Sequence, residues 1–197
     1  QYFLKDNIPA GFVEIKDQKV KYILHPEDEV TGIKYRLLSF NQGFTAELFD
    51  ELELSKYLDI IDEHLMHPDG VRLMDKTVKY QGGTPEIFMR AETATNFGRE
   101  IGLQYVHAHI RYIEAMAKVG EGERLFTGLK KINPILIKDN VPNAKTRQSN
   151  VYFSSSDGDF INRYQADQHF DDLRKGKVAV KGGWRLYSSG PGIYLNQ

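Results

Sequence analysis

Hydrophobic and polar residues alternate between residues 11 and 24, on both sides of a short polar turn. The turn Lys16-Asp17-Gln18 separates two apolar runs, which consist of Phe12, Val13 and Ile15 before it and Val20, Tyr22, Ile23 and Leu24 after it. Side chains that repeat every two positions share one face of a β-strand, and two such runs joined by a polar turn pair as a hairpin. Residues 1–27 are therefore predicted to form a β-hairpin or an extended arm.

Apolar residues in much of the remaining chain recur at steps of three and four, the spacing of one face of an α-helix. This spacing predicts helices over residues 31–49, 56–66, 103–119, 121–132 and 160–173. The buried stripes predicted for the first four are Ile33, Leu37, Phe40, Phe44 and Leu48; Leu58, Ile61 and Leu65; Val106, Ile110, Ile113 and Ala117; and Leu125, Leu129 and Ile132.

Signals at the helix ends complete this picture. Ser55 is the predicted N-cap of the helix over 56–66, and Gly120 ends the helix over 103–119. The short link after Gly120 predicts that the next helix packs antiparallel to it. Irregular stretches are expected over 68–101 and 142–159, with a brief strand over 178–180. The predicted fold is mainly α: one domain over 1–197, built of paired helices with long loops at one end.

Composition narrows the class of protein. The 197 residues are 41% hydrophobic and 27% charged, which favours a globular domain, and the net charge of −1 disfavours nucleic-acid binding. The absence of cysteine excludes disulfides and thiolate metal sites and suits a cytoplasmic location, and no apolar stretch is long enough for a membrane span. The chain opens on Gln1 rather than Met and stops at Gln197 inside a predicted helix, so we expect a fragment of a longer protein.

The end of the chain carries a candidate anion site. Ser188 or Ser189 can cap a helix that begins near Pro191, and Gly190 lies between the two serines and this proline. The free N–H groups and the positive end of the helix dipole would then face one point, which suits a phosphate. An ordinary Ser-Gly turn before a helix has the same sequence.

Other candidate residues lie near the helix over 103–119. His107 and His109 are two positions apart and point to different faces, so no metal site is predicted, and a hydrogen-bonded core or surface role remains open for each. Arg99 and Glu100 could bind sugar hydroxyls, or could be ordinary charges before a helix. Pairs of carboxylates, Glu92 with Glu100 or Asp157 with Asp159, are a weak indication of glycoside hydrolysis.

Several motifs together resemble the inverting glycoside phosphorylases of glycoside hydrolase family 94, in particular the branch that acts on 1,2-β-oligoglucans. They are FGREIGL from Phe97, YVHAHIRY from Tyr105, RQSN from Arg147, GWRLYSSGPG from Gly183, PDGVRLM from Pro68 and TGIKYRLL from Thr31. The resemblance covers nearly the whole chain. It implies that these residues are the C-terminal half of an (α/α)6 barrel, with the residue 1–27 arm preceding it.

The resemblance also implies residue roles. A histidine on a helix and a Thr-Gly loop bind phosphate in the family, and the matching positions are His107 and Ser188-Ser189, followed by Gly190. Ser189 stands where the family has glycine. A basic residue followed by glutamate contacts sugar, which implies Arg99 and Glu100, although lysine is commoner than arginine there.

The same resemblance implies what the chain lacks. Cellobiose-type relatives have Glu-Pro-Tyr where this chain has Gln148-Ser149-Asn150, which implies another acceptor linkage and places Gln148 near sugar. The general-acid aspartate of the family lies upstream of Gln1, so the chain alone is expected to be inactive. No cofactor is implied, because inorganic phosphate is a substrate. The partners implied are β-1,2-glucooligosaccharides, phosphate or α-glucose 1-phosphate, and the remainder of the enzyme.

Three alternatives remain open from the sequence. One is the related phosphorylase-like region of cyclic β-1,2-glucan synthases. Another is a non-catalytic glucan-binding module, which would need no anion site. The third is a hydrolase that uses Glu100 and Asp157 as its own two carboxylates.

Overall fold

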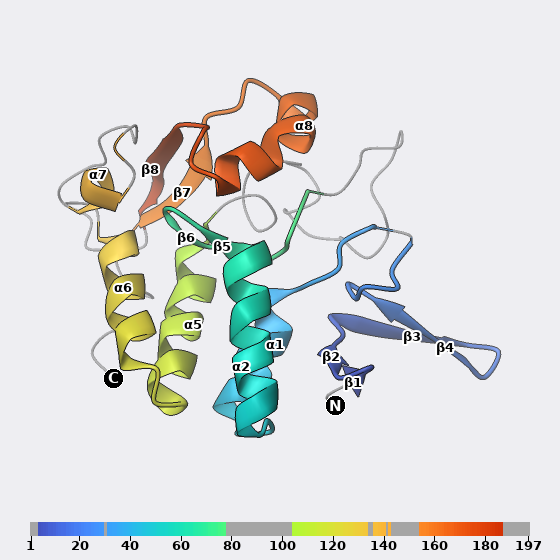
Figure 1. Cartoon of the computed structure of the whole chain (residues 1–197). Helices are drawn as coiled ribbons and strands as arrows, with labels where there is room; N and C mark the ends of the chain where they lie inside the picture. Colours follow the sequence, from blue (N-terminus) through green and yellow to red (C-terminus); the bar gives the residue numbers. More distant parts are fainter. Residues whose placement is uncertain are drawn as a thin grey trace.

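The computed structural model describes residues 4–29, 31–77, 104–133, 136–140, 142 and 154–186. Within these residues, helices α2, α5 and α6 stand side by side with α1 behind α2 in this view, and small antiparallel strand pairs flank the helices (Figure 1). Strands β5 to β8 and helix α8 gather at one end of α5, whereas the hairpin β3–β4 projects away from the helices. The described fold is therefore mixed, and half of an (α/α)6 barrel is not seen in this part of the chain.

The predicted N-terminal hairpin is confirmed. Strands β3 (Phe12–Lys16) and β4 (Lys19–Ile23) pair antiparallel, with Ile15 opposite Val20. A smaller pair, β1 (Leu4–Lys5) and β2 (Ile8–Pro9), precedes it. The hairpin is anchored at its base, where the Gly11 N–H donates to the Leu24 carbonyl at 3.2 Å and Leu24 is fully buried.

Helix α1 (Leu37–Thr45) is shorter than the predicted helix over 31–49. A distant carboxylate explains the late start, because Asp75 accepts the backbone N–H groups of Lys34 at 3.0 Å and Tyr35 at 3.2 Å. These bonds hold the chain before the helix against residues 73–75. Ile33 is buried outside the helix, and Leu48, predicted to be buried, is 51% exposed beyond its end.

Helix α2 (Glu51–Ile60) begins earlier than predicted, and its cap is Asp50 rather than Ser55. The Asp50 carboxylate accepts the Glu53 N–H at 2.8 Å, and the Glu53 carboxylate accepts the Asp50 N–H at 3.3 Å. This reciprocal pair is a capping box, which satisfies two backbone donors at the helix start. The helix continues into one π-helical stretch, Ile61–Leu65, and the predicted stripe of Leu58, Ile61 and Leu65 is buried.

We expect Asp50→Ala to lower the free energy of unfolding by about 1 kcal/mol, because it leaves the Glu53 N–H in the first turn of α2 without its side-chain acceptor. Ser55 is exposed inside the same helix, so Ser55→Ala should be neutral or slightly stabilising. Urea denaturation of both variants decides between the two caps. A larger loss for Ser55→Ala would contradict the observed cap.

Helices α5 (Val106–Lys118) and α6 (Gly122–Ile132) form the predicted antiparallel pair (Figure 1). Gly120 lies in the turn between them with a φ of +81°, a left-handed conformation that favours glycine. Val106, Ile110 and Ile113 are buried as predicted. Ala117 is exposed, which corrects the predicted stripe, and the buried face continues through Ala115 and Met116.

The stretch predicted to be irregular over 142–159 contains strand β7 (Ser154–Gly158), which pairs antiparallel with β8 (Val180–Leu186). The strand predicted over 178–180 therefore starts later and runs further. Helix α8 (Arg163–Arg174) lies between these strands in sequence, and its N-cap Asn162 accepts the N–H groups of Tyr164 and Gln165. A short helix α7 (Ile137–Asn140) follows α6.

The described residues form two cores. The larger one lies among α1, α2, α5 and the end of α6, and it includes Phe40, Tyr57 and Tyr112. The smaller one is formed by Phe160, Ala166, Phe170, Leu173 and Val180, on α8 and the adjoining strand. None of the described helices is long and apolar enough to cross a lipid bilayer.

Candidate anion site at the start of helix α5

His107 lies in the first turn of α5, at the end where the small strand pairs gather (Figure 1). This end of the helix is suited to an anion, because its N-cap side chain, Tyr105, makes no capping hydrogen bond and its first turn contains no acidic residue. The His107 side chain is partly exposed, and its ring lies 5.1 Å from that of Tyr105 between centroids.

The His107 imidazole favours its neutral form in the described structure. Burial lowers its pKa below the ordinary value of 6.5, and the positive charge of Arg111, one turn further along, lowers the pKa further. A bound phosphate dianion would act in the opposite direction, because a nearby negative charge favours the imidazolium. An anion bound beside His107 would therefore be coupled to proton uptake by its imidazole.

His109 lies behind this turn and is fully buried. Its Nδ1 accepts the backbone N–H of Val71 at 3.1 Å, so its Nε2 carries the proton and donates to the Gly128 carbonyl at 2.9 Å. The ring is thus a hydrogen-bonded core histidine, one of the two roles open from the sequence. It links α5 to strand β6 (Gly70–Val71) on one side and to α6 on the other.

A buried ion pair joins the turn between β5 (Met66–His67) and β6 to the residue that directly follows β6. The Arg72 Nη2 donates to the Asp69 Oδ2 at 3.1 Å, and both side chains are fully buried. The same turn is held to α6 by Lys131, whose ammonium donates to the His67 carbonyl at 3.0 Å. Burial lowers the pKa of Lys131. The turn is therefore rigidly connected to both helices of the α5–α6 pair.

The His67 ring lies between this turn and the smaller core. It contacts the Phe170 ring edge-on at 5.2 Å, and within the described residues neither ring nitrogen has a hydrogen-bond partner. Burial lowers its pKa well below 6.5, and the nearby charge of Arg72 adds to that effect. His67 is therefore a neutral buried histidine in the folded protein.

We expect the protein to lose stability as the pH falls from about 6.5 to about 4. Burial lowers the pKa of His109 from 6.5 to about 4, so over this interval the unfolded chain binds a proton that the folded chain does not. The loss attributable to His109 reaches about 3 kcal/mol below pH 4, and His67 acts in the same direction. Urea denaturation midpoints at pH 7.5 and 4.5 measure it.

His109→Gln is the matched variant for this test, because glutamine does not titrate. Its midpoint should change less between the two pH values than that of the unsubstituted protein. Equal pH dependence in the His109→Gln variant would contradict the assignment.

Of the residues predicted to form the site, the structure describes His107. Arg99, Glu100, Gln148, Ser188, Ser189 and Gly190 lie outside the described residues, as does Glu92. Asp157 lies in strand β7 and Asp159 directly after it. No group of histidine and acidic side chains suited to a metal ion occurs among the described residues.

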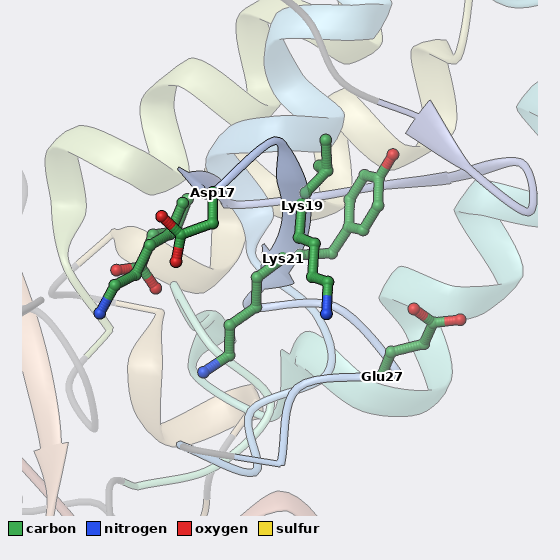
Figure 2. A pocket seen from close by; sticks show the side chains of 8 residues that line it. Asp17, Lys19, Lys21 and Glu27 are labelled. Atoms are coloured by element: carbon green, nitrogen blue, oxygen red, sulfur yellow. The ribbon is translucent and has the colours of Figure 1, made fainter.

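Two hollows on the described surface lie away from His107. One, of about 600 Å³, lies along the hairpin β3–β4, where Lys19 and Lys21 extend from the same strand and Glu27 lies across from them (Figure 2). The other, of about 490 Å³, is lined by residues of the π-helical stretch, α5 and α6, among them Arg124 and Lys131. Neither is lined by His107, so the hollows do not mark the predicted site.

The buried Asp69–Arg72 pair and the clamp formed by His109 were not predicted as parts of the site. The sequence placed Pro68-Asp69-Gly70 at the start of a stretch expected to be irregular, in a motif that carries the family resemblance. Opposite charges three residues apart around a glycine are common on protein surfaces, and no pattern in the sequence indicates that this pair is buried.

Comparison with known proteins gives one strong similarity. The chain is 55% identical, over 193 residues that make up 98% of its length, to a protein of Listeria innocua serovar 6a named 1,2-beta-oligoglucan phosphorylase. This similarity confirms the predicted resemblance to the phosphorylases that act on 1,2-β-oligoglucans. The chain spans 18% of the length of that protein. No protein-family model matches the chain.

Proposed function

We propose that this chain, which is related along almost its entire length to a 1,2-beta-oligoglucan phosphorylase, is a segment of an inverting phosphorylase that cleaves β-1,2-glucooligosaccharides with phosphate. The observation that carries the proposal is the 55% identity over 193 residues. Because the chain spans 18% of the relative, the activity belongs to a longer polypeptide. This segment contributes phosphate and sugar contacts to it.

The start of α5 supports the role of His107 in binding phosphate. The helix offers the positive end of its dipole, without an acidic residue in the first turn that would repel an anion. The imidazole is neutral in the absence of phosphate and gains a proton when phosphate binds. A charge-assisted hydrogen bond from the imidazolium then holds one phosphate oxygen.

Ser188, Ser189 and Gly190 are proposed to complete the phosphate site. The Ser188 hydroxyl takes the place of the threonine hydroxyl of glycoside hydrolase family 94, and the backbone N–H groups that follow it bind further oxygens. Arg99 and Glu100 are proposed to bind sugar hydroxyls, since a carboxylate accepts from them and a guanidinium donates to them. Gln148 is proposed to lie near the acceptor sugar.

The proposed reaction needs one carboxylic acid from another part of the longer protein. That acid donates its proton to the glycosidic oxygen as the bond from the oxygen to the anomeric carbon breaks. A phosphate oxygen attacks the anomeric carbon from the opposite face and forms α-glucose 1-phosphate with inversion. The protein's contribution in this segment is to hold phosphate in line with that carbon.

Product analysis of the whole enzyme with β-1,2-glucooligosaccharides tests the proposal. With phosphate, the expected product is α-glucose 1-phosphate, and without phosphate no turnover is expected. Free glucose formed at the same rate in both conditions would instead support hydrolysis by two carboxylates. Cyclic glucan as the main product would support the synthase-associated alternative, and glucan binding without turnover would support a binding module.

A further inference from the structure

The first turn of α5 is fixed to two other elements through one side chain, His109. The ring accepts a hydrogen bond from β6 through Val71 and donates one to α6 through Gly128. Both bonds are made in a fully buried position, where neither partner can exchange them for bonds to water. A shift of this turn would break both.

Two glycines let these elements approach the ring. At Gly70, whose φ is +124°, a Cβ atom would lie 2.8 Å from the His109 Nδ1. At Gly128, a Cβ atom would lie 3.0 Å from Ile113 and 3.4 Å from the His109 Nε2. The backbones of β6 and α6 therefore pack closely against the two edges of the imidazole.

His107 belongs to the same helical turn. Two residues along an α-helix correspond to about 3 Å of rise, so the two histidines share one rigid piece of backbone while pointing to different faces. His109 does not point toward the exposed side of the helix start, because it is buried among β6 and α6. Its effect on His107 can therefore pass only through the backbone of α5.

We propose that His109 is a positioning residue for the phosphate site: by clamping the first turn of α5 between β6 and α6, it sets the place of the His107 imidazole and of the helix N-terminus relative to the phosphate. This proposal rests on the proposed function. Displacement of a binding group by about 1 Å is enough to change a rate by as much as a hundredfold. Loss of the clamp should therefore appear in the phosphate dependence.

The test uses the whole enzyme with His109→Leu, His109→Gln and His109→Asn. Leucine removes both bonds, the glutamine amide can replace the donor to Gly128, and the asparagine amide can replace the acceptor for Val71. We expect His109→Leu to raise the KM for phosphate about tenfold, with the KM for oligoglucan within twofold of normal. Glutamine or asparagine should recover part of this change.

Tyr112→Phe is the matched control. It removes a buried polar atom from α5 one turn further from His107, where Tyr112 is 1% exposed. Both KM values should stay unchanged. If His109→Gln and His109→Asn fold with lowered melting temperatures and normal KM for phosphate, His109 is structural only and the proposal is overturned.

His107→Ala is measured beside these variants to test the positioning role of His109 separately from the phosphate site at His107. A changed KM for phosphate in His107→Ala with normal values in all folded His109 variants overturns the positioning role alone. An unchanged KM for phosphate in His107→Ala overturns the proposed phosphate site itself. Phosphate titration by calorimetry repeats each comparison without turnover.

Discussion

Replacing His107 with alanine in the whole enzyme is expected to raise the phosphate concentration needed for half-maximal rate about ten- to a hundredfold. The lost interaction is a charge-assisted hydrogen bond to the anion, which contributes roughly 1.5–3 kcal/mol to binding. The KM for oligoglucan should change much less, because the proposed contact is to phosphate. Initial rates over a grid of both substrates give the two values.

His169→Ala serves as the control for this substitution. His169 is an exposed histidine on α8 with its own acidic neighbour, Asp172, at 3.0 Å. The variant should leave both KM values unchanged. If His107→Ala instead raised the two KM values equally, His107 would be a residue of the fold rather than of the phosphate site.

A second large effect is expected from Asp69→Ala. The substitution leaves the guanidinium of Arg72, which is fully buried, without its carboxylate partner. Breaking a buried ion pair from one side costs about 3–5 kcal/mol, because the remaining charge stays out of water. Amide hydrogen exchange of peptides from α5 and from residues 66–74 should show this loss as faster local opening.

Two further variants serve as a control for an exposed ion pair and as a test of rescue. Glu114→Ala breaks the exposed pair between Glu114 and Arg111 and should cost no more than about 1 kcal/mol. The double variant Asp69→Leu with Arg72→Met removes both charges and should recover a large part of the stability lost in Asp69→Ala. A mild effect of Asp69→Ala, similar to that of Glu114→Ala, would contradict the role of the buried pair.

The local parts of the fold could be predicted from the sequence because their signals are local. The alternation around Lys16-Asp17-Gln18 predicted the hairpin, and the stripe of Leu58, Ile61 and Leu65 predicted a buried helix face. The start of α1 could not be predicted, since Asp75 holds the chain before it from about 40 residues away. Strand β7 was missed because its serine-rich sequence has little preference for strands.

In the candidate site, too, the features set by nearby residues could be predicted and those set by distant residues could not. His107 was identified by its motif, and the spacing of apolar residues predicted that it lies on a helix; that helix starts at Val106 rather than at residue 103, so His107 lies in its first turn. The clamp behind it depends on Val71 and Gly128, which are separated from His109 by 38 and 19 residues. No short-range pattern indicates that these residues meet, so the second histidine of the motif could be described only as one of two alternatives.

The most direct test of the phosphate site is a crystal structure of the whole enzyme with bound phosphate. We expect an anion within hydrogen-bond distance of the His107 imidazole, between the start of α5 and Ser188. Crystals of the His107→Ala variant, grown at the same phosphate concentration, should contain no anion at that position. Phosphate bound away from His107, with the oligoglucan in place, would contradict the account.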